Sequence, residues 1–374
     1  MPTLTHSQKL ERLIRDEMDQ NSGYLSFARF MELALYAPEL GYYSAASEKF
    51  GGLGDFVTAP LISPLFTQCV AAQCLEVAAH LGAYDFLELG AGTGKFAGDI
   101  LLTLEKAGLL PTHYFILEIS ADLRARQHTL LQQMCPHLLA RVQWLEQLPT
   151  TPITGIIFAN EVLDALPVHV FQYDELGLRE RCVTVHNEKF VWDLMPASSE
   201  LSRATEAILP LCSQPTISEI NLSLPTWISA LENSLKQGLI LLIDYGYHRR
   251  DYYHPDRTEG TLMCHYRHQR HTDPLIHVGL QDITAHVDFT YVIESTTHLT
   301  LAGYTTQAAF LLNCGLLELA NNTLSATATY QQSQAIKQLT LPGEMGEIVK
   351  VMGLSKDLDI PLRGFSFLDR RRDL

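Results

Sequence analysis

A glycine-rich loop constrains the fold of this chain more than any other feature of the sequence. Residues 85–89 form a short apolar run, and residues 90–94 read Gly-Ala-Gly-Thr-Gly. Beyond the loop, Phe96, Ile100 and Leu104 recur at helical spacing. Glycine allows the backbone to turn sharply and to approach a ligand closely. The segment therefore predicts a strand, a tight loop and an amphipathic helix, which together open an α/β fold.

Later segments repeat this pattern of short apolar strands between amphipathic helices. Further strands are predicted at residues 114–118, 142–145, 155–159 and 239–244. Strands that are apolar on both faces are typical of a buried parallel sheet covered by helices. We therefore expect an α/β protein with a doubly wound, mostly parallel sheet.

The length of 374 residues allows roughly two to three domains at about 150 residues each. We expect residues 1–84 to form an N-terminal helical section, because residues 7–36 and 62–82 have helical character, and residues 85–374 to form the main core. The apolar stripe of the first helix comprises Leu10, Leu13, Ile14 and Met18. Two insertions are expected within the core, at about 169–235, where the start alternates like antiparallel strands, and at about 246–290.

Composition excludes several classes of protein. With 47% hydrophobic and 18% charged residues, the chain is globular and not disordered. The net charge of −15 argues against broad nucleic-acid binding, which needs a basic face. The seven cysteines form no CxxC pair, so neither a disulfide framework nor a zinc knuckle is predicted. No signal peptide and no apolar run of about 20 residues are present, so we predict a cytoplasmic protein without a membrane span.

Two common phosphate-binding motifs do not fit the glycine loop. In a dinucleotide-binding GxGxxG motif, the last glycine would fall on Lys95. In a P-loop, the first glycine would fall on Leu89 and the Ser or Thr on Phe96. The loop is therefore predicted to bind a different kind of cofactor.

The pattern that remains is ExGxGxG, from Glu88 through Gly90, Gly92 and Gly94. It resembles motif I of class I S-adenosylmethionine-dependent methyltransferases, in which this turn holds the methionine part and the sugar. Glu118 ends the next predicted strand, where a carboxylate can accept hydrogen bonds from ribose hydroxyls. The alternative is a plain glycine turn followed by an acid that flanks a helix. Together, the loop and the acid favour a cofactor site.

Further segments narrow the resemblance to one family. They read GDFVTAP at 54–60, NEVLDALPVH at 160–169, IDYGY at 243–247 and GLQDITAHVDF at 279–289. In this order around the glycine loop, they resemble the MidA family, which includes the mitochondrial complex I assembly-factor arginine methyltransferase and its bacterial relatives. The resemblance covers about residues 8–365. It implies a class I methyltransferase fold, S-adenosylmethionine as the methyl donor, and an arginine of a partner protein as the acceptor.

The resemblance also implies a role for the segment around residue 58. Its loop would cover the cofactor, so Asp55, Thr58 and Pro60 are predicted at the cofactor site, together with Asn160. The alternatives are a turn-forming aspartate and a helix N-cap. Leu61 departs from the family, which often has an acid at this position.

Methylation of arginine requires carboxylates near the acceptor. The guanidinium stays protonated at neutral pH, so an acid must orient it and stabilise charge as the proton leaves. Glu161 and Asp164 are candidate catalytic acids, because an i, i+3 spacing would place both on one face of a helical turn. Asp244 is a further candidate, and His286 is a candidate proton acceptor or substrate contact. Acids of a helix start and a structural histidine are the alternatives.

The histidines between residues 248 and 286 suggest a metal site, but their spacing matches no metalloenzyme motif and methyl transfer needs no metal, so none is predicted. The leading hypothesis is a protein arginine methyltransferase that recognises a partner protein. Part of the acidic charge would then line a cleft for a cationic segment. Two alternatives stay open, namely a non-catalytic assembly factor and a small-molecule methyltransferase. The oligomeric state is also open.

Overall fold

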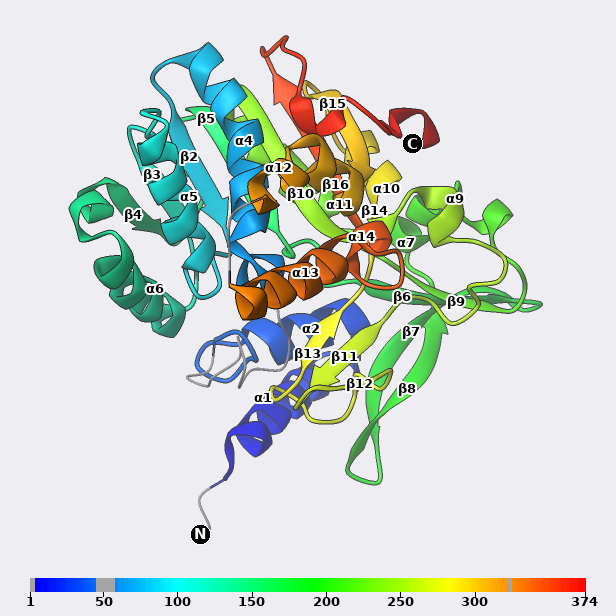
Figure 1. The fold of residues 1–374 in the computed structure, drawn as a ribbon. Helices are drawn as coiled ribbons and strands as arrows, with labels where there is room; N and C mark the ends of the chain where they lie inside the picture. The colour runs from blue at the N-terminus through cyan, green and yellow to red at the C-terminus, as the bar shows by residue number, and fades with distance from the viewer. Residues whose placement is uncertain (1–3, 45–57, 322–324) are drawn as a thin grey trace. The chain divides into compact units, whose positions relative to one another are not determined.

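The structure is a computed structural model that describes residues 4–44, 58–321 and 325–374 (Figure 1). Contacts divide the chain into two units. The described residues of unit 1 fall within Met1–Phe56, Asp164–Pro225 and Tyr247–Asp288, and those of unit 2 within Val57–Leu163, Thr226–Gly246 and Phe289–Leu374. The division at residue 84 remains a prediction.

Unit 2 contains the predicted sheet. Its strands are β2 (Asp85–Leu89), β3 (Tyr114–Leu117), β4 (Val142–Leu145), β5 (Ile153–Asn160), β10 (Leu235–Tyr247), β15 (Thr300–Thr306) and β16 (Val349–Lys356). Its helices are α3 (Ala59–Ile62), α4 (Pro64–Leu81), α5 (Lys95–Lys106), α6 (Ala121–Met134), η1 (Pro136–Arg141), α8 (Leu224–Ser234), α10 (Phe289–Glu294), α11 (Gln307–Asn313), α12 (Leu316–Ala320), α13 (Ala326–Thr340), α14 (Met345–Ile348), η3 (Arg363–Phe365) and η4 (Arg371–Asp373). All five strands predicted from the sequence are present.

The strand order of this sheet, β15-β16-β10-β5-β2-β3-β4, places the glycine loop at a point where the topology reverses. The chain runs outward from β2 to β3 and β4, then returns to place β5 on the other side of β2. Right-handed connections put the helices of the two directions on opposite faces of the sheet. Along this order, β16 runs antiparallel to its neighbours β10 and β15, whereas β10, β5, β2, β3 and β4 pair in parallel. The predicted doubly wound, mostly parallel α/β fold is confirmed, and ligands of such folds bind at the reversal point.

Stacked aromatic rings hold the glycine loop on the sheet. Phe96, in the first turn of α5, stacks on Phe158 of β5 with ring centroids 4.2 Å apart. Phe86 of β2 stacks on Tyr114 of β3 at 5.0 Å. All four side chains are buried, and each buried ring of this size contributes about 1.5–3 kcal/mol by removing apolar surface from water. The strands on either side of the loop are thus fixed by packing.

Unit 1 combines helices with two small antiparallel sheets. Its strands are β1 (Tyr24–Ser26), β6 (His169–Asp174), β7 (Gly177–His186), β8 (Lys189–Pro196), β9 (Thr216–Ile220), β11 (Met263–Tyr266), β12 (Gln269–His271), β13 (Asp282–Thr284) and β14 (Val287–Asp288). Its helices are α1 (His6–Gln20), α2 (Phe27–Tyr36), α7 (Ser199–Thr205), η2 (Leu209–Leu211) and α9 (Arg249–Tyr252). The sheets have the orders β1-β7-β6-β9, with β8 on β7, and β12-β11-β13. The predicted antiparallel strands after residue 169 are therefore present.

The first helix differs in two details from its prediction. Leu10, Ile14 and Met18 are buried, but Leu13 is 40% exposed, because at 3.6 residues per turn it lies on the edge of the face that these three residues share. The helical region is also interrupted, since β1 pairs with β7 before α2 begins. Ser26 then caps α2 by accepting a hydrogen bond from the Arg29 backbone N–H.

Among the helices that the structure describes, none combines the length and the apolar character that crossing a membrane requires.

Candidate active site

The glycine loop of unit 2 has no side chain at three of its five positions, Gly90, Gly92 and Gly94. Gly90, Gly92 and Gly94 have φ values of 62°, 52° and 84°, in the left-handed region that favours glycine. A Cβ atom on Gly90 would lie 3.3 Å from Val162 Cγ2, and one on Gly94 would lie 3.2 Å from Gln127 Cα. Glycine at these two positions lets the loop lie this close to Val162 and Gln127, and its bare, sharply turned backbone fits the predicted nucleoside cofactor.

Glu118 lies just beyond β3, at the carboxyl edge of the same sheet, and is buried. One carboxylate oxygen accepts a hydrogen bond from the Ser120 backbone N–H at 2.9 Å, and the other accepts one from Gln127 Nε2 at 3.1 Å. Burial raises the pKa of Glu118, whereas these hydrogen bonds lower it. The Ile119 backbone N–H also donates to this carboxylate, which has about four lone-pair sites, so one stays available for a ribose hydroxyl. Ser120 also caps α6, as the sequence predicts.

Glu88, the acid of the ExGxGxG motif, is also buried. Its carboxyl accepts a hydrogen bond of 2.7 Å from the Tyr114 hydroxyl. Burial raises the pKa of Glu88 to about 8, although the bond from Tyr114 opposes the shift. Its predicted contact with the cofactor remains a prediction.

We expect Glu88 to make stability depend on pH. The unfolded carboxyl ionises near 4.5 and the folded one near 8. Between these values the folded state holds the extra proton, so the free energy of unfolding falls as pH rises, by at most about 1.4 kcal/mol per pH unit. Glu88→Gln cannot ionise, so this contribution disappears. Urea unfolding of both proteins at several pH values between 5 and 8 measures the difference, and parallel curves for the two would contradict it.

The chain turns sharply after β5. Glu161 has a φ of 53°, which is unusual for a residue other than glycine and is typical of functional sites. One oxygen of its carboxylate accepts hydrogen bonds from the Ala59 backbone N–H at 3.3 Å and from Asn160 Nδ2 at 3.2 Å. Thr58 is the N-cap residue of α3 and Pro60 lies in its first turn. The segment that begins at Thr58 is thus connected to Glu161 by the hydrogen bond from the Ala59 N–H.

Asn160 has a buried oxygen that is available to accept a hydrogen bond from a ligand. Its Nδ2 donates to Glu161, but its Oδ1 is buried and has no hydrogen-bond partner within the described parts of the chain. A buried acceptor without a partner costs about 1–3 kcal/mol. A donor group of the cofactor would satisfy it, so Asn160 fits its predicted place at the cofactor site.

The predicted helical turn at residues 161–164 is absent, because these residues form a bend and a turn. Asp244 explains the geometry. Its fully buried carboxylate accepts hydrogen bonds from the backbone N–H groups of Val162 at 3.0 Å, Leu163 at 2.7 Å and Tyr245 at 2.8 Å. These bonds keep the backbone N–H groups after β5 directed at Asp244, so that the segment forms a bend and not a helical turn. The structure therefore places Asp244 as a support of the loop that carries Glu161.

Replacing Asp244 by asparagine is expected to destabilise the fold by about 3 kcal/mol, because the amide turns a donor toward backbone donors and weakens charge-assisted hydrogen bonds. Asp359→Asn is the matched control, since Asp359 is exposed, and it should change stability by less than about 0.5 kcal/mol. Urea unfolding measures both. Equal, small effects would show that Asp244 does not hold the loop.

Unit 1 brings together two other predicted residues. Asp164 is buried, and its backbone carbonyl accepts a hydrogen bond from the Ala285 N–H at 2.9 Å. The next residue, His286, donates its backbone N–H to Thr261 Oγ1 at 3.0 Å. The His286 ring lies edge-on to Tyr247, with centroids 5.3 Å apart. The segments of Asp164 and His286 therefore lie side by side.

A buried carboxylate that sequence reasoning missed, Glu219, supports this cluster. Glu219 of β9 accepts hydrogen bonds from the Thr261 backbone N–H, at 3.1 and 3.0 Å to its two oxygens, and from Thr261 Oγ1 at 3.2 Å. Burial raises the pKa of Glu219 to about 7. Because Thr261 Oγ1 also binds the His286 backbone, Glu219 fixes the segment that presents His286.

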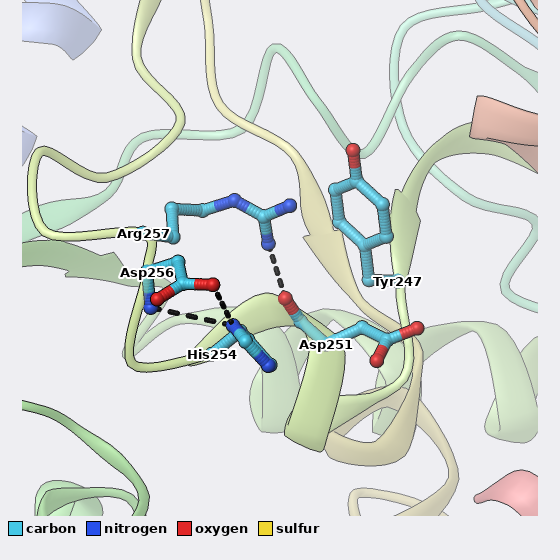
Figure 2. A pocket seen from close by; sticks show the side chains of 5 residues that line it. All are labelled: Tyr247, Asp251, His254, Asp256 and Arg257. Atoms are coloured by element: carbon cyan, nitrogen blue, oxygen red, sulfur yellow. Dashed lines mark hydrogen bonds and ion pairs between the residues drawn. The ribbon is translucent and has the colours of Figure 1, made fainter.

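A pocket of about 360 Å³ lies in unit 1 (Figure 2). Tyr247, Asp251, His254, Asp256 and Arg257 line it. The Arg257 guanidinium lies over the Tyr247 ring, with Cζ 4.2 Å from the centroid, and donates a hydrogen bond to the Asp251 carbonyl. His254 Nδ1 lies 3.6 Å from Asp256 Oδ2. The pocket therefore already contains one guanidinium, held between an aromatic face and backbone carbonyl oxygens.

The predicted site residues thus fall into two groups. Unit 2 contains Thr58, Pro60, Glu88, Gly90, Gly92, Gly94, Glu118, Asn160 and Glu161, whereas unit 1 contains Asp164 and His286. Asp55 lies outside the described residues. Within the described ranges, no group of three or more His, Cys, Asp or Glu side chains could hold a metal ion.

The fold and the loop together define a nucleoside-binding α/β enzyme of the class I methyltransferase type. Residues 69–305 match the model of a family of S-adenosyl-L-methionine-dependent methyltransferases. A solved structure from Burkholderia thailandensis, bound to S-adenosyl-homocysteine, is 36% identical, with a TM-score of 0.93 and full coverage of both chains. This chain belongs to that methyltransferase family. Its predicted cofactor, S-adenosylmethionine, is confirmed by the family and by this neighbour.

Two curated relatives carry a more specific name, "Protein arginine methyltransferase NDUFAF7, mitochondrial". The one from Danio rerio is 28% identical over 364 residues, which cover 87% of this chain and 82% of the relative. The one from Homo sapiens is 27% identical over 365 residues, covering 88% and 79%. These relatives confirm the resemblance to the MidA family.

The same names correct the predicted location. The curated relatives are mitochondrial proteins by name, so the prediction of a cytoplasmic protein is wrong. That prediction rested on the lack of a recognisable signal peptide and of a long apolar segment. Both features are shared by proteins of several compartments, so they do not decide between them.

Proposed function

We propose that this chain transfers a methyl group from S-adenosylmethionine to an arginine side chain of a partner protein. The observation that carries the proposal is the set of relatives named protein arginine methyltransferase, which align with 87–88% of the chain. The identity of the partner protein is left open.

The acids of the site suit a guanidinium acceptor. S-adenosylmethionine supplies an electrophilic methyl group on a sulfonium. The protein must hold the acceptor nitrogen in line with that methyl group and stabilise the positive charge until a proton leaves. We propose that Glu161 orients the guanidinium, because its carboxylate is fixed by hydrogen bonds from Ala59 and Asn160 and its backbone is held in a strained conformation. Asp164 and His286 are proposed as further acceptor-side contacts.

The pocket beside Tyr247 supports the same substrate class. The Arg257 guanidinium lies over the Tyr247 ring and donates hydrogen bonds to the Asp251 and Tyr252 carbonyls, which supports a preference of this face for planar cations. We propose that this face helps to bind a basic segment of the partner protein. The net charge of −15 would also attract such a segment.

The test is methyl transfer from labelled S-adenosylmethionine into a lysate of the host, with the Gly92→Val variant as a negative control. Label in the protein fraction is expected. Label only in the small-molecule fraction would favour a small-molecule methyltransferase. Binding of S-adenosylmethionine without any transfer would favour the non-catalytic assembly factor, and either outcome would contradict the proposal.

A further inference from the structure

A completely buried glutamine connects the glycine loop to Glu118, the acid predicted to bind the ribose. Gln127 lies in α6, and its Nε2 donates hydrogen bonds to the Gly92 carbonyl at 3.0 Å and to the Glu118 carboxylate at 3.1 Å. Its Oε1 accepts a hydrogen bond from Trp144 Nε1 at 2.9 Å. One side chain therefore links α6, the glycine loop, and residues from β4 and the end of β3.

The orientation of this amide is fixed by its partners. The indole N–H of Trp144 can only donate, so it must face the amide oxygen of Gln127. The amide nitrogen then faces Gly92 and Glu118, which present only acceptors to it. Both donors and the acceptor of the amide are satisfied without a ligand. In addition, Gly94 packs against the Gln127 stem, where a Cβ atom would lie 3.2 Å from Cα.

We propose that Gln127 is a positioning residue for the cofactor. It sets the separation between the carbonyl of Gly92 and the carboxylate of Glu118, so that the loop and the ribose-binding acid are arranged before S-adenosylmethionine binds. Gln127 itself would touch neither the methyl group nor the acceptor. The inference depends on the family's cofactor and is independent of the identity of the methylated side chain.

The charges around Glu118 add a property that a purely structural glutamine would not have. Glu88 on β2 lies close enough to interact with it electrostatically, and Arg124 on α6 lowers the pKa of Glu118. Arg124 is itself paired with Glu146 at 2.6 Å. The Gln127 amide lowers the pKa of Glu118 further, so its removal raises that pKa. Because ribose hydroxyls need the ionised acceptor, a higher pKa moves the loss of cofactor binding on acidification to higher pH.

The experiment is calorimetric titration of the full chain with S-adenosylhomocysteine between pH 5.5 and 8.5. Gln127→Met keeps the shape of the side chain but removes its hydrogen bonds. We expect the Kd to rise about 10- to 100-fold at neutral pH, since a hydrogen bond to a charged group contributes about 1.5–3 kcal/mol. The acid limb of the affinity profile should move to higher pH than in the original protein.

Gln73→Met is the matched control, because Gln73 is equally buried, accepts from the Gly364 N–H at 2.8 Å and lies in α4. Its affinity for S-adenosylhomocysteine should not change. Trp144→Phe provides a second test that leaves Gln127 in place, with an expected loss of about threefold because the amide is free to turn. If Gln127→Met does not fold, an unchanged affinity in Trp144→Phe overturns the proposal. In a folded Gln127→Met, either an unchanged affinity or an unshifted acid limb overturns it.

Discussion

Replacing Gly92 by valine should weaken the binding of S-adenosylmethionine at least about 100-fold. Gly92 has a φ of 52°, which a β-branched side chain adopts only at a cost of about 1–3 kcal/mol. Its carbonyl also accepts the hydrogen bond from Gln127, so a shifted backbone would disturb the support of Glu118 as well. Calorimetry with S-adenosylmethionine measures the effect.

Gly108→Val separates loss of the site from general backbone strain. Gly108 has a φ of 70° and lies between α5 and β3, and a Cβ atom there would meet no atom within 4 Å. The substitution carries a similar conformational cost but lies outside the glycine loop. We expect a lower melting temperature and unchanged affinity for S-adenosylmethionine. Equal affinities of the Gly92 and Gly108 variants would contradict the cofactor site.

Glu161→Gln should reduce kcat about 10²- to 10³-fold while S-adenosylmethionine affinity stays within about threefold. The amide keeps the size of the side chain and one acceptor for the Ala59 N–H, but it removes the negative charge that orients a guanidinium. Steady-state methyl transfer together with calorimetry measures both quantities. The expected pattern is lost turnover with intact cofactor binding.

Glu188→Gln is the control for this variant. Glu188 has a φ of 62°, so it shares the unusual backbone conformation of Glu161, but it is exposed in the turn between β7 and β8. Its substitution should leave both kcat and cofactor affinity unchanged. If Glu161→Gln retains full turnover, Glu161 does not serve the acceptor and the proposed role is wrong.

Local patterns in the sequence were sufficient for the core of the fold. The strands near residues 85, 114, 142, 155 and 239 are short apolar runs. Such runs are typical of strands that are buried on both faces of a sheet. The glycine loop was also predictable, because a run of alternating glycines after a strand has few structural explanations. The acid at Glu118 followed from its place at the end of the next strand.

Contacts between distant residues were not predictable in the same way. Gln127 bonds to Gly92 and Glu219 bonds to Thr261, but nothing in the neighbouring sequence of either side chain marks it as a polar partner. The antiparallel strand β16 lies between β10 and β15, although it follows β15 in the chain. The place of a strand in the sheet and the partner of a buried polar side chain depend on residues far away in the sequence. Each unit is itself built from separate segments of the chain. The bend at Glu161 also arises from a distant residue, Asp244.

Tandem mass spectrometry of the methylated product tests the central claim most directly. The full chain is incubated with isotopically labelled S-adenosylmethionine and host lysate, and the labelled peptides are sequenced to find the residue that carries the methyl group. The account predicts label on arginine side chains, absent in the Gly92→Val and Glu161→Gln reactions. Label on lysine, on a carboxylate or on a small molecule, at a comparable rate and with none on arginine, would contradict it.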